Sequence, residues 1–297
     1  MTEPRIGLVV STIGRVEPLK RLLDSVIPQL GEHDSVVVVS QGAEQDCAAL
    51  ARSLDRETSA TVTCITSAKG LSVGRNAGAV ALGDRVDVLM FPNDRSVYPD
   101  GLLARVRKSM KKADIVSAAV KSDGGFRVRP LEPGARLTAY SAWDVHEAGL
   151  AIRSDLFARL EGFDPLLGVG APTPFQAAEG ADLLLRALKL DRVLVFEALP
   201  RELSVRNSPF GYGLSDAERR RKARAYARGV GRVLAMHGPS RRVFRSLAGA
   251  ASSFVRQREV TLVDSLAVLT GRIEGLAWGA ASDLCSGVRT LWARRRP

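Results

Sequence analysis

Short apolar runs and segments with helical periodicity alternate through the first two-thirds of this 297-residue chain. The apolar runs predict buried strands, and apolar residues that recur every three or four positions predict helices. Because helices separate the strands, the pattern predicts βαβ units and a mostly parallel, doubly wound α/β sheet. The expected strands are 6–10, 35–39, 61–66 and 86–91, and the expected helices are 16–30, 46–54 and 74–81.

The pattern changes to nearly continuous helix in the last part of the chain. Ser215 and Glu218 have the spacing of a capping box, which predicts the start of a helix. Two further amphipathic stretches follow it, with apolar residues in steps of three or four. The expected helices run from 215 to 238, from 240 to about 257 and from 263 to 291.

The formal charge of +11 lies entirely in this helical region. Residues 216–297 hold 17 Arg and Lys against 6 acidic residues, whereas residues 1–215 hold 26 of each sign. Such asymmetry indicates a partner with an anionic surface, either a membrane or a nucleic acid. The region has few aromatic residues and no recognised nucleic-acid-binding motif, so we expect no nucleic acid. We therefore divide the chain into an α/β domain at 1–214 and a basic α-helical region at 215–297.

Arginines beside an apolar helical stripe are typical of a peripheral membrane anchor, in which the apolar face enters the interface and the cations meet anionic headgroups. The alternative is that the stripes pack on each other or on the α/β domain. Gly271, Gly275 and Gly279, at four-residue spacing, would allow such close helix packing.

Cysteine usage and the N-terminus favour a cytoplasmic protein. Cys47, Cys64 and Cys285 are odd in number and lack metal-ligand spacing, which indicates free thiols. The first residues lack the basic and apolar segments of a signal peptide, and no apolar stretch reaches the ~18 residues of a spanning helix. We expect a cytoplasmic location, peripheral at the inner face of the membrane.

Polar residues follow each of the four expected strands. The carboxyl ends of parallel strands share one edge of the sheet, which is where ligands bind in such folds. Four unrelated surface turns are the alternative interpretation. The residues are Ser11 and Thr12, Ser40 and Gln41, Lys69 and Gly70, and Asn93, Asp94 and Arg95.

Four segments together resemble the family 2 glycosyltransferases of the GT-A fold, over roughly residues 5–190. The resemblance implies an inverting transfer of a sugar, of the hexosyltransferase type, from a nucleotide-diphosphate-sugar to a glycan or lipid-linked acceptor in cell-surface polysaccharide assembly. The segments are VVSTIGRVEPLKRLLDSV at 9–26, GLSVGRNAGA at 70–79, FPNDRSVYP at 91–99 and FDPLLGVGAPTPFQAAEGADLLLRAL at 163–188.

The donor side of the expected site matches the parts of a nucleotide-sugar. Ser11 and Thr12 can offer hydroxyls to the base, or cap a turn. Arg75 can bind a phosphate with its forked donor pair, with Asn76 beside it and Gly70 allowing close backbone approach. The alternative is a solvated Arg75 on a helix face.

The residue that would select the nucleotide base differs from that of relatives. Relatives usually end the second strand with an aspartate that reads the base, whereas this chain has Ser40, followed by Gln41. Serine still donates and accepts a hydrogen bond but carries no charge. We favour a UDP- or dTDP-sugar.

The fourth strand ends in Asn93, Asp94 and Arg95, where relatives carry two or three aspartates that bind ribose and a divalent ion. Asn93 can bond a ribose hydroxyl, and Asp94 remains a candidate metal ligand. Arg95 stands at the position that matches the metal-binding aspartate of relatives, so its guanidinium can take the place of Mg²⁺ or Mn²⁺ against the diphosphate. Alternatively, Asp94 binds the metal, or the site has lost activity.

An acidic cluster at 179–182 supplies the candidates for the catalytic base. Relatives often use the second acid of a pair, but that position is Gly180 here. Glu179, expected at the start of a helix in a Gly- and Pro-rich loop, suits a base that must reach an acceptor hydroxyl. Asp182 is the second candidate, with an i,i+4 ion pair to Arg186 as its structural alternative.

Trp143, Asp144, His146 and Glu147 precede a segment that lines the acceptor side in relatives. Trp143 could stack on a sugar, and the polar residues could bond hydroxyls, although a histidine beside an aromatic residue is often a packing residue. A non-catalytic module that binds a nucleotide or glycan on the same fold is the rival function. It is favoured by the missing aspartates at Ser40, Arg95 and Gly180.

Overall fold

The computed structural model describes residues 3–190, 192–238, 240–252 and 260–293, with the side chains of the last helix described as far as Trp278. The chain forms two compact units. The first comprises residues 1–165 and 183–210, and the second comprises residues 166–182 and 211–297. The chain passes from the first unit to the second after residue 210, close to the boundary at 214 that we expect. In addition, the segment 166–182 belongs to the same unit as the C-terminal helices.

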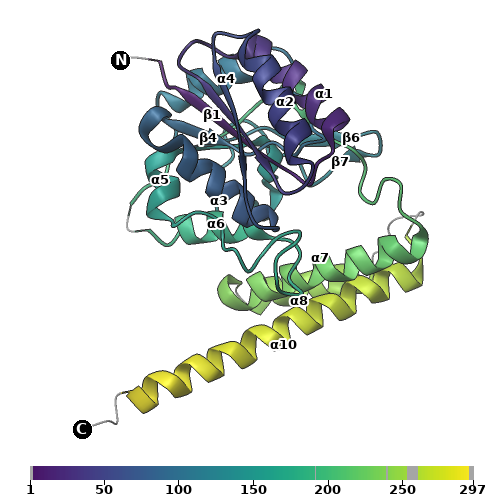
Figure 1. Ribbon diagram of the computed structural model, residues 1–297. Coiled ribbons are helices and arrows are strands. Elements are labelled where there is room, and N and C mark those ends of the chain that lie inside the picture. Colours follow the sequence, from purple (N-terminus) through teal and green to yellow (C-terminus); the bar gives the residue numbers. More distant parts are fainter. Residues whose placement is uncertain (1–2, 191, 239, 253–259, 294–297) are drawn as a thin grey trace. The chain divides into compact units, whose positions relative to one another are not determined.

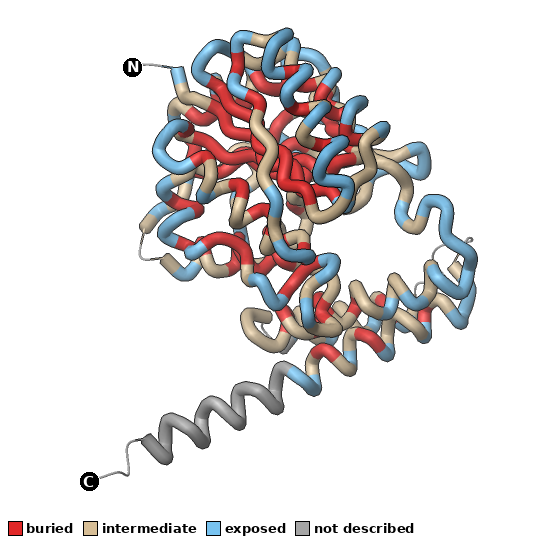
Figure 2. Tube along the Cα trace, viewed as in Figure 1, coloured by how far each residue is buried: buried red, intermediate tan, exposed pale blue. Residues whose placement is uncertain are grey.

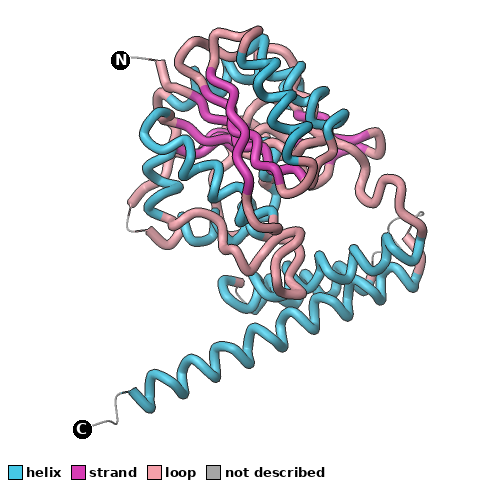
Figure 3. The backbone as a smooth tube through the Cα atoms, viewed as in Figure 1, coloured by secondary structure: helices cyan, strands magenta, loops and turns pink. Residues whose placement is uncertain are grey.

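A seven-stranded, mostly parallel sheet forms the centre of the first unit (Figures 1 and 3), as the alternation of apolar runs predicts. β8 is the exception, because it runs antiparallel to both β4 and β5. In sheet order the strands are β3 (Thr61–Thr66), β2 (Ser35–Ser40), β1 (Ile6–Thr12), β4 (Val88–Met90), β8 (Leu150–Arg153), β5 (Ile115–Ser117) and β9 (Phe196–Ala198). A second sheet joins β10 (Val205–Arg206), β6 (Val120–Ser122) and β7 (Gly125–Phe126).

Helices flank the large sheet because alternate strand residues face opposite sides. Leu8 and Val10 of β1 belong to the main apolar core with the helices α1 and α4. Val9 points the other way, towards α3, where a Cβ at Gly78 would clash with it. Figure 2 shows the resulting buried centre. The helices are α1 (Val16–Val26), α2 (Glu44–Asp55), α3 (Leu71–Leu82), α4 (Leu102–Met110) and α5 (Ser154–Arg159), and α6 (Glu179–Ala187) begins in the second unit and ends in the first.

Several boundaries differ from those that periodicity predicts. β1 continues to Thr12, so Ser11 and Thr12 end the strand rather than follow it. The helix expected to reach residue 30 ends at Val26 and continues as a 3₁₀ helix, Ile27–Gln29, where Pro28 lacks the donor for an α-helical bond. β4 covers only Val88–Met90 of the apolar run at 86–91.

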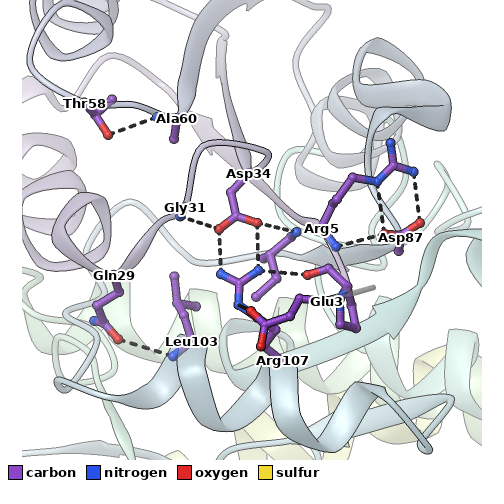
Figure 4. A network of polar contacts seen from close by, with 12 residues as sticks. Glu3, Arg5, Gln29, Gly31, Asp34, Thr58, Ala60, Asp87, Leu103 and Arg107 are labelled. Atoms are coloured by element: carbon purple, nitrogen blue, oxygen red, sulfur yellow. Dashed lines mark hydrogen bonds and ion pairs between the residues drawn. The ribbon is translucent and has the colours of Figure 1, made fainter. Parts of the chain in front are cut away.

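A polar network fixes the amino ends of the strands, opposite the edge where we expect ligands (Figure 4). The Asp34 carboxylate accepts hydrogen bonds from the backbone N–H groups of Ile6 and Gly31, both at 2.7 Å. Arg107 of α4 donates two more, at 3.1 and 2.6 Å. These bonds tie β1, β2 and α4 together and satisfy a buried charge.

The second unit is helical, as expected. α7 (Asp216–His237) starts at the predicted capping box, in which Ser215 and Glu218 bond each other's backbone N–H groups. α8 (Ser240–Ala251) and α10 (Leu262–Ala293) follow it. The remainder of the second expected helix, from residue 253, lies outside the described residues.

α7 and α10 pack closely along one face. A Cβ at Gly271 or Gly275 would clash with backbone carbonyls of α7, which agrees with the glycine-packing alternative for this face. Arg224 and Arg228 of α7 both pair with Glu274 of α10. Part of the basic charge is therefore used between helices. Gly279 and the apolar positions 284, 288 and 291 lie outside the described side chains.

None of the helices, over the residues that the structure describes, is both long and apolar enough to cross a bilayer.

Candidate functional site

The ends of β1 and β4 meet through Thr12 and Asp94. These strands are hydrogen-bonded neighbours, so their carboxyl ends lie side by side. The Thr12 hydroxyl donates to Asp94 Oδ2 at 2.8 Å and accepts from the N–H groups of Gly14 and Arg15, each at 3.2 Å. Thr12 therefore closes the turn into α1, which matches the turn-capping alternative, and it also joins the two strand ends. Its contact with a nucleotide base stays a prediction.

Arg15 forms a two-point ion pair with Asp94. Its Nη2 lies 2.6 Å from Oδ1 and its Nε lies 3.0 Å from Oδ2. The Asp94 side chain is 2% exposed, whereas that of Arg15 is 39% exposed. Arg15 was not predicted as a site residue. The signal in the sequence was that Arg15 lies in the turn after β1, while the acid Asp94 follows the neighbouring strand β4.

The contacts of Asp94 show whether this strand end suits a divalent cation. Both Asp94 oxygens already accept donors from Arg15 and Thr12, and the next residue is a second arginine, Arg95, which is half-buried. Among the residues described, no group of three or more His, Cys, Asp or Glu side chains is arranged to hold a metal. Hard cations need several oxygen ligands. The side chains at this strand end therefore do not fit a resident Mg²⁺ or Mn²⁺.

Arg75 is buried on α3 and aimed at the end of β4. Its side chain is 1% exposed, and Nη2 donates to Asn93 Oδ1 at 3.1 Å. The guanidinium also lies over the Phe163 ring, 5.2 Å from its centroid. Phe163 in turn packs edge to face on Phe91 and on Phe157, and all three ring centroids lie 4.9 to 5.3 Å apart. Because the Arg75 side chain is buried against Phe163, the alternative of a solvated Arg75 on a helix face is excluded.

Asn76, next to Arg75, is bonded to the backbone. Its Nδ2 donates to the Phe163 carbonyl at 2.8 Å, and its Oδ1 accepts from the Phe163 N–H at 2.9 Å. The side chain thereby holds the turn at Gly162, whose φ is +70°. Asn76 thus supports Phe163 and, through it, Arg75. A donor contact from the same side chain stays a prediction.

Ser40 and Gln41 organise the loops around the predicted base site. Ser40 is buried, and its hydroxyl donates to the Gly42 carbonyl at 2.5 Å. Gln41 Nε2 lies within 3.0 Å of Ser67 Oγ and within 2.8 Å of the Gly70 carbonyl, so it fastens the loop before α3 to β2. Gly70 needs its glycine, because its φ is +127°. Whether any of them contacts a base stays a prediction.

Ser11 carries a hydroxyl with unused bonding capacity at the end of β1. Its Oγ is buried and has no hydrogen-bond partner among the described atoms. A Cβ at Gly74 would clash with this Oγ and with the Gln41 amide, so the start of α3 passes close above both. A buried hydroxyl without a partner at a ligand edge is a candidate for ligand contact.

The predicted acceptor residues lie on or directly before two 3₁₀ helices of the first unit, η3 (Ser141–Asp144) and η4 (Glu147–Gly149). Trp143, Asp144, His146 and Glu147 are all half-buried. His146 Nδ1 accepts the Ala148 N–H at 3.2 Å. Burial lowers the pKa of His146, so the ring is neutral near pH 7. His146 therefore caps η4, which matches the packing alternative for this residue without excluding contact through Nε2.

The two candidate bases lie in the second unit. Glu179 is the first residue of α6 and is buried, and Ala178 before it has a φ of +73°, which is uncommon for a residue with a Cβ. Asp182 is 1% exposed, and its Oδ1 lies 2.8 Å from Nε2 of His237, the last residue of α7. Sequence reasoning missed His237, since the two residues are 55 positions apart. No pattern in either segment points to the other.

Scans against protein-family models and curated proteins gave no match. Solved structures do match. The S. aureus TarS 1–349 structure covers 91% of this chain and 92% of its own, with a TM-score of 0.58 at 14% identity. Its complex with UDP-GlcNAc has the same TM-score at 12% identity.

A second solved protein matches as well. The mannosyltransferase PcManGT from Pyrobaculum calidifontis, in complex with GDP-Man and Mn²⁺, covers 98% of this chain and 81% of its own, with a TM-score of 0.52 at 12% identity. At such identities the likeness concerns the fold. The mostly parallel seven-stranded sheet with flanking helices and a C-terminal helical region is thus the architecture of a GT-A glycosyltransferase.

Proposed function

We propose that this protein is an inverting glycosyltransferase of the hexosyltransferase type, related to family 2, that uses a nucleotide-diphosphate-sugar. The observation that carries the proposal is the buried Arg75, bonded to Asn93 at the carboxyl end of β4. A GT-A sheet provides a nucleotide-sugar site at that edge, and a fixed guanidinium there suits a diphosphate. The solved TarS and PcManGT structures, which share the fold, were determined with UDP-GlcNAc and GDP-Man.

The reaction we propose is a single displacement. An acceptor hydroxyl attacks the anomeric carbon as the bond to the diphosphate oxygen breaks, which inverts the configuration. Glu179 takes the hydroxyl proton, and the leaving nucleoside diphosphate takes the bonding electron pair. Arg75 and Arg95 stabilise the negative charge that develops on the diphosphate, in the way fixed cations do in transition states.

We infer no step through a metal, because the Asp94 carboxylate is bonded to Arg15 and Thr12. Ser11, Thr12, Ser40 and Gln41 remain the proposed contacts to the base, and a UDP- or dTDP-sugar remains the favoured donor. The acceptor is a glycan or a lipid-linked glycan in polysaccharide assembly, bound on the side of Trp143, Asp144, His146 and Glu147.

The described face of α10 supports the proposed peripheral membrane contact. Its exposed side chains as far as Trp278 carry no charge over more than four turns: Leu262, Val263, Leu266, Thr270, Ile273, Ala277 and Trp278. On α8, exposed Phe244 lies between the exposed arginines Arg241 and Arg245. A second copy of this region would bring two charges of +11 together, whereas an anionic lipid surface complements both features.

Flotation with liposomes of graded anionic-lipid content tests the membrane contact. Binding should fall with salt and with deletion of 216–297, and Leu266→Glu should weaken it, while Ala217→Glu on the exposed start of α7 serves as a matched control. Absence of binding to strongly anionic vesicles at low salt would remove this part of the proposal.

The enzymatic proposal is tested by donor hydrolysis and transfer across a panel of nucleotide-sugars. Glu179→Gln should lower turnover by about 10²-fold or more while leaving donor affinity nearly unchanged, because loss of a general base affects the chemical step. Donor binding without turnover of any sugar would favour the non-catalytic module instead. Normal turnover in Glu179→Gln would show that another residue is the catalytic base.

A further inference from the structure

A buried histidine–aspartate pair joins the C-terminal helices to the segment that carries the proposed base. His237 Nε2 lies 2.8 Å from Asp182 Oδ1, and the two side chains are 5% and 1% exposed. A carboxylate only accepts hydrogen bonds, so the ring nitrogen donates, which holds for the Nε2–H tautomer and for the protonated ring alike. The pair lies within the second unit.

The segment before α6 is fastened to α7 at further points. The Gln176 N–H donates to the Ala225 carbonyl at 3.4 Å. A Cβ at Gly229 would clash with the Ala177 backbone, so α7 approaches this segment as closely as a glycine permits. Phe175 packs edge to face on Trp278 of α10, with centroids 6.0 Å apart. The loop therefore belongs structurally to the helices, although it interrupts the α/β part of the sequence.

The backbone of Asp182 is also bonded to the residue that precedes Glu179. Its backbone N–H donates to the Ala178 carbonyl at 2.9 Å, which closes the first turn of α6. Ala178 has a positive φ, a conformation of low intrinsic stability that surrounding contacts must hold. Asp182 is thus tied at one end to the strained residue before Glu179 and at the other end to His237.

We infer that His237 is a positioning residue for Glu179, acting through Asp182, so that the C-terminal helices hold the proposed base in its working orientation. This inference rests on the proposed function, because Glu179 matters only if it is the base. It assigns the helical region a part in catalysis that is independent of any membrane contact.

Two substitutions at position 237 separate positioning from simple stabilisation. His237→Gln keeps an N–H donor that can reach Asp182, whereas His237→Phe keeps the ring volume and loses the donor. His237→Phe should lower kcat by about 10- to 100-fold, the scale of a roughly 1 Å misplacement of a catalytic group, with the KM for the donor nearly unchanged. His237→Gln should retain most of the wild-type kcat. His33, an exposed histidine, supplies the control His33→Ala.

Hydrogen exchange provides a readout that does not depend on activity. In His237→Phe, the Asp182 amide should exchange at least about 10-fold faster than in the wild type, and in His237→Gln it should stay protected. Wild-type kcat in a folded His237→Phe, or equal loss of kcat in both substitutions, would overturn the inference. Faster exchange in His237→Phe with no turnover in any variant, including the wild type, would instead identify the proposed function as the part that fails.

Discussion

Replacing Arg15 with alanine should destabilise the protein and expose the Asp94 carboxylate to added cations. Removing one partner of a buried ion pair typically costs about 3–5 kcal/mol. Arg15 is 39% exposed, so water would partly solvate the abandoned carboxylate, and we expect about 1–3 kcal/mol. For a unit of this size that corresponds to a fall in Tm of about 2–12 °C.

The assay is thermal unfolding of the full chain, with and without Mn²⁺, chelator and UDP. Adding Asp94→Asn to Arg15→Ala should restore part of the lost stability, because no buried charge is then left without its partner. Mn²⁺ should stabilise Arg15→Ala more than the wild type, since the released oxygens become available to it. Lys20→Ala removes an exposed i,i+4 pair with Asp24 and serves as the control, with an effect below about 0.5 kcal/mol.

Two results would refute this reasoning. One is an Arg15→Ala protein as stable as the wild type, which would mean that the pair does not hold the strand ends together. The other is loss of UDP binding by the wild type in chelator, with recovery in Mn²⁺, which would show that Asp94 binds an ion in spite of Arg15.

Three further changes test other parts of the structure. Asp34→Asn should cost about 1–3 kcal/mol in chemical denaturation, because Asp34 accepts from two backbone N–H groups and from Arg107. Asn76→Ala should lower kcat more than it lowers the UDP affinity measured by calorimetry. The Asn76 side chain bonds to the Phe163 backbone, so it acts on the site indirectly, by holding Phe163 and through it Arg75. The hydrogen bond from Thr261, with help from Arg220, lowers the pKa of Asp264 to about 2, so its carboxylate stabilises the fold above about pH 4. This contribution of about 2 kcal/mol should disappear as the pH falls from about 4 to about 2, and Asp264→Asn should lack that part of the acid transition in circular dichroism.

The strands and helices were predictable because each depends on a local pattern. The apolar runs of β1, β2 and β3 predict burial of those same residues. The capping box at Ser215 predicts a helix that starts at the next residue. The antiparallel β8 was not predicted, since its four residues, Leu150–Arg153, give no sign of strand direction or of insertion between β4 and β5.

The candidate site was predictable only in part, for a similar reason. Strand ends located Thr12, Asn93 and Asp94 correctly at one edge of the sheet, because the parallel topology fixes where strands end. Arg15 and His237 were missed because each meets its partner 79 or 55 residues away in the chain. Such pairs follow from tertiary packing, and neither local periodicity nor residue spacing contains that information.

The charge arrangement at the strand ends explains how a GT-A site could accept a diphosphate with so few carboxylates. The resemblance implies aspartates where this chain has Ser40 and Arg95, and the remaining acid there, Asp94, is held by Arg15. Each carboxylate near a diphosphate repels it, and in a metal-dependent site the ion must offset that repulsion as well as bind the donor. Arginine in place of the aspartate at position 95 removes one repulsive charge beside the diphosphate and adds one attractive charge, whereas Ser40 stands at the position that reads the base. A site with this charge arrangement has less need of an ion, so the substitution that weakens the metal ligand set also lowers the demand for a metal.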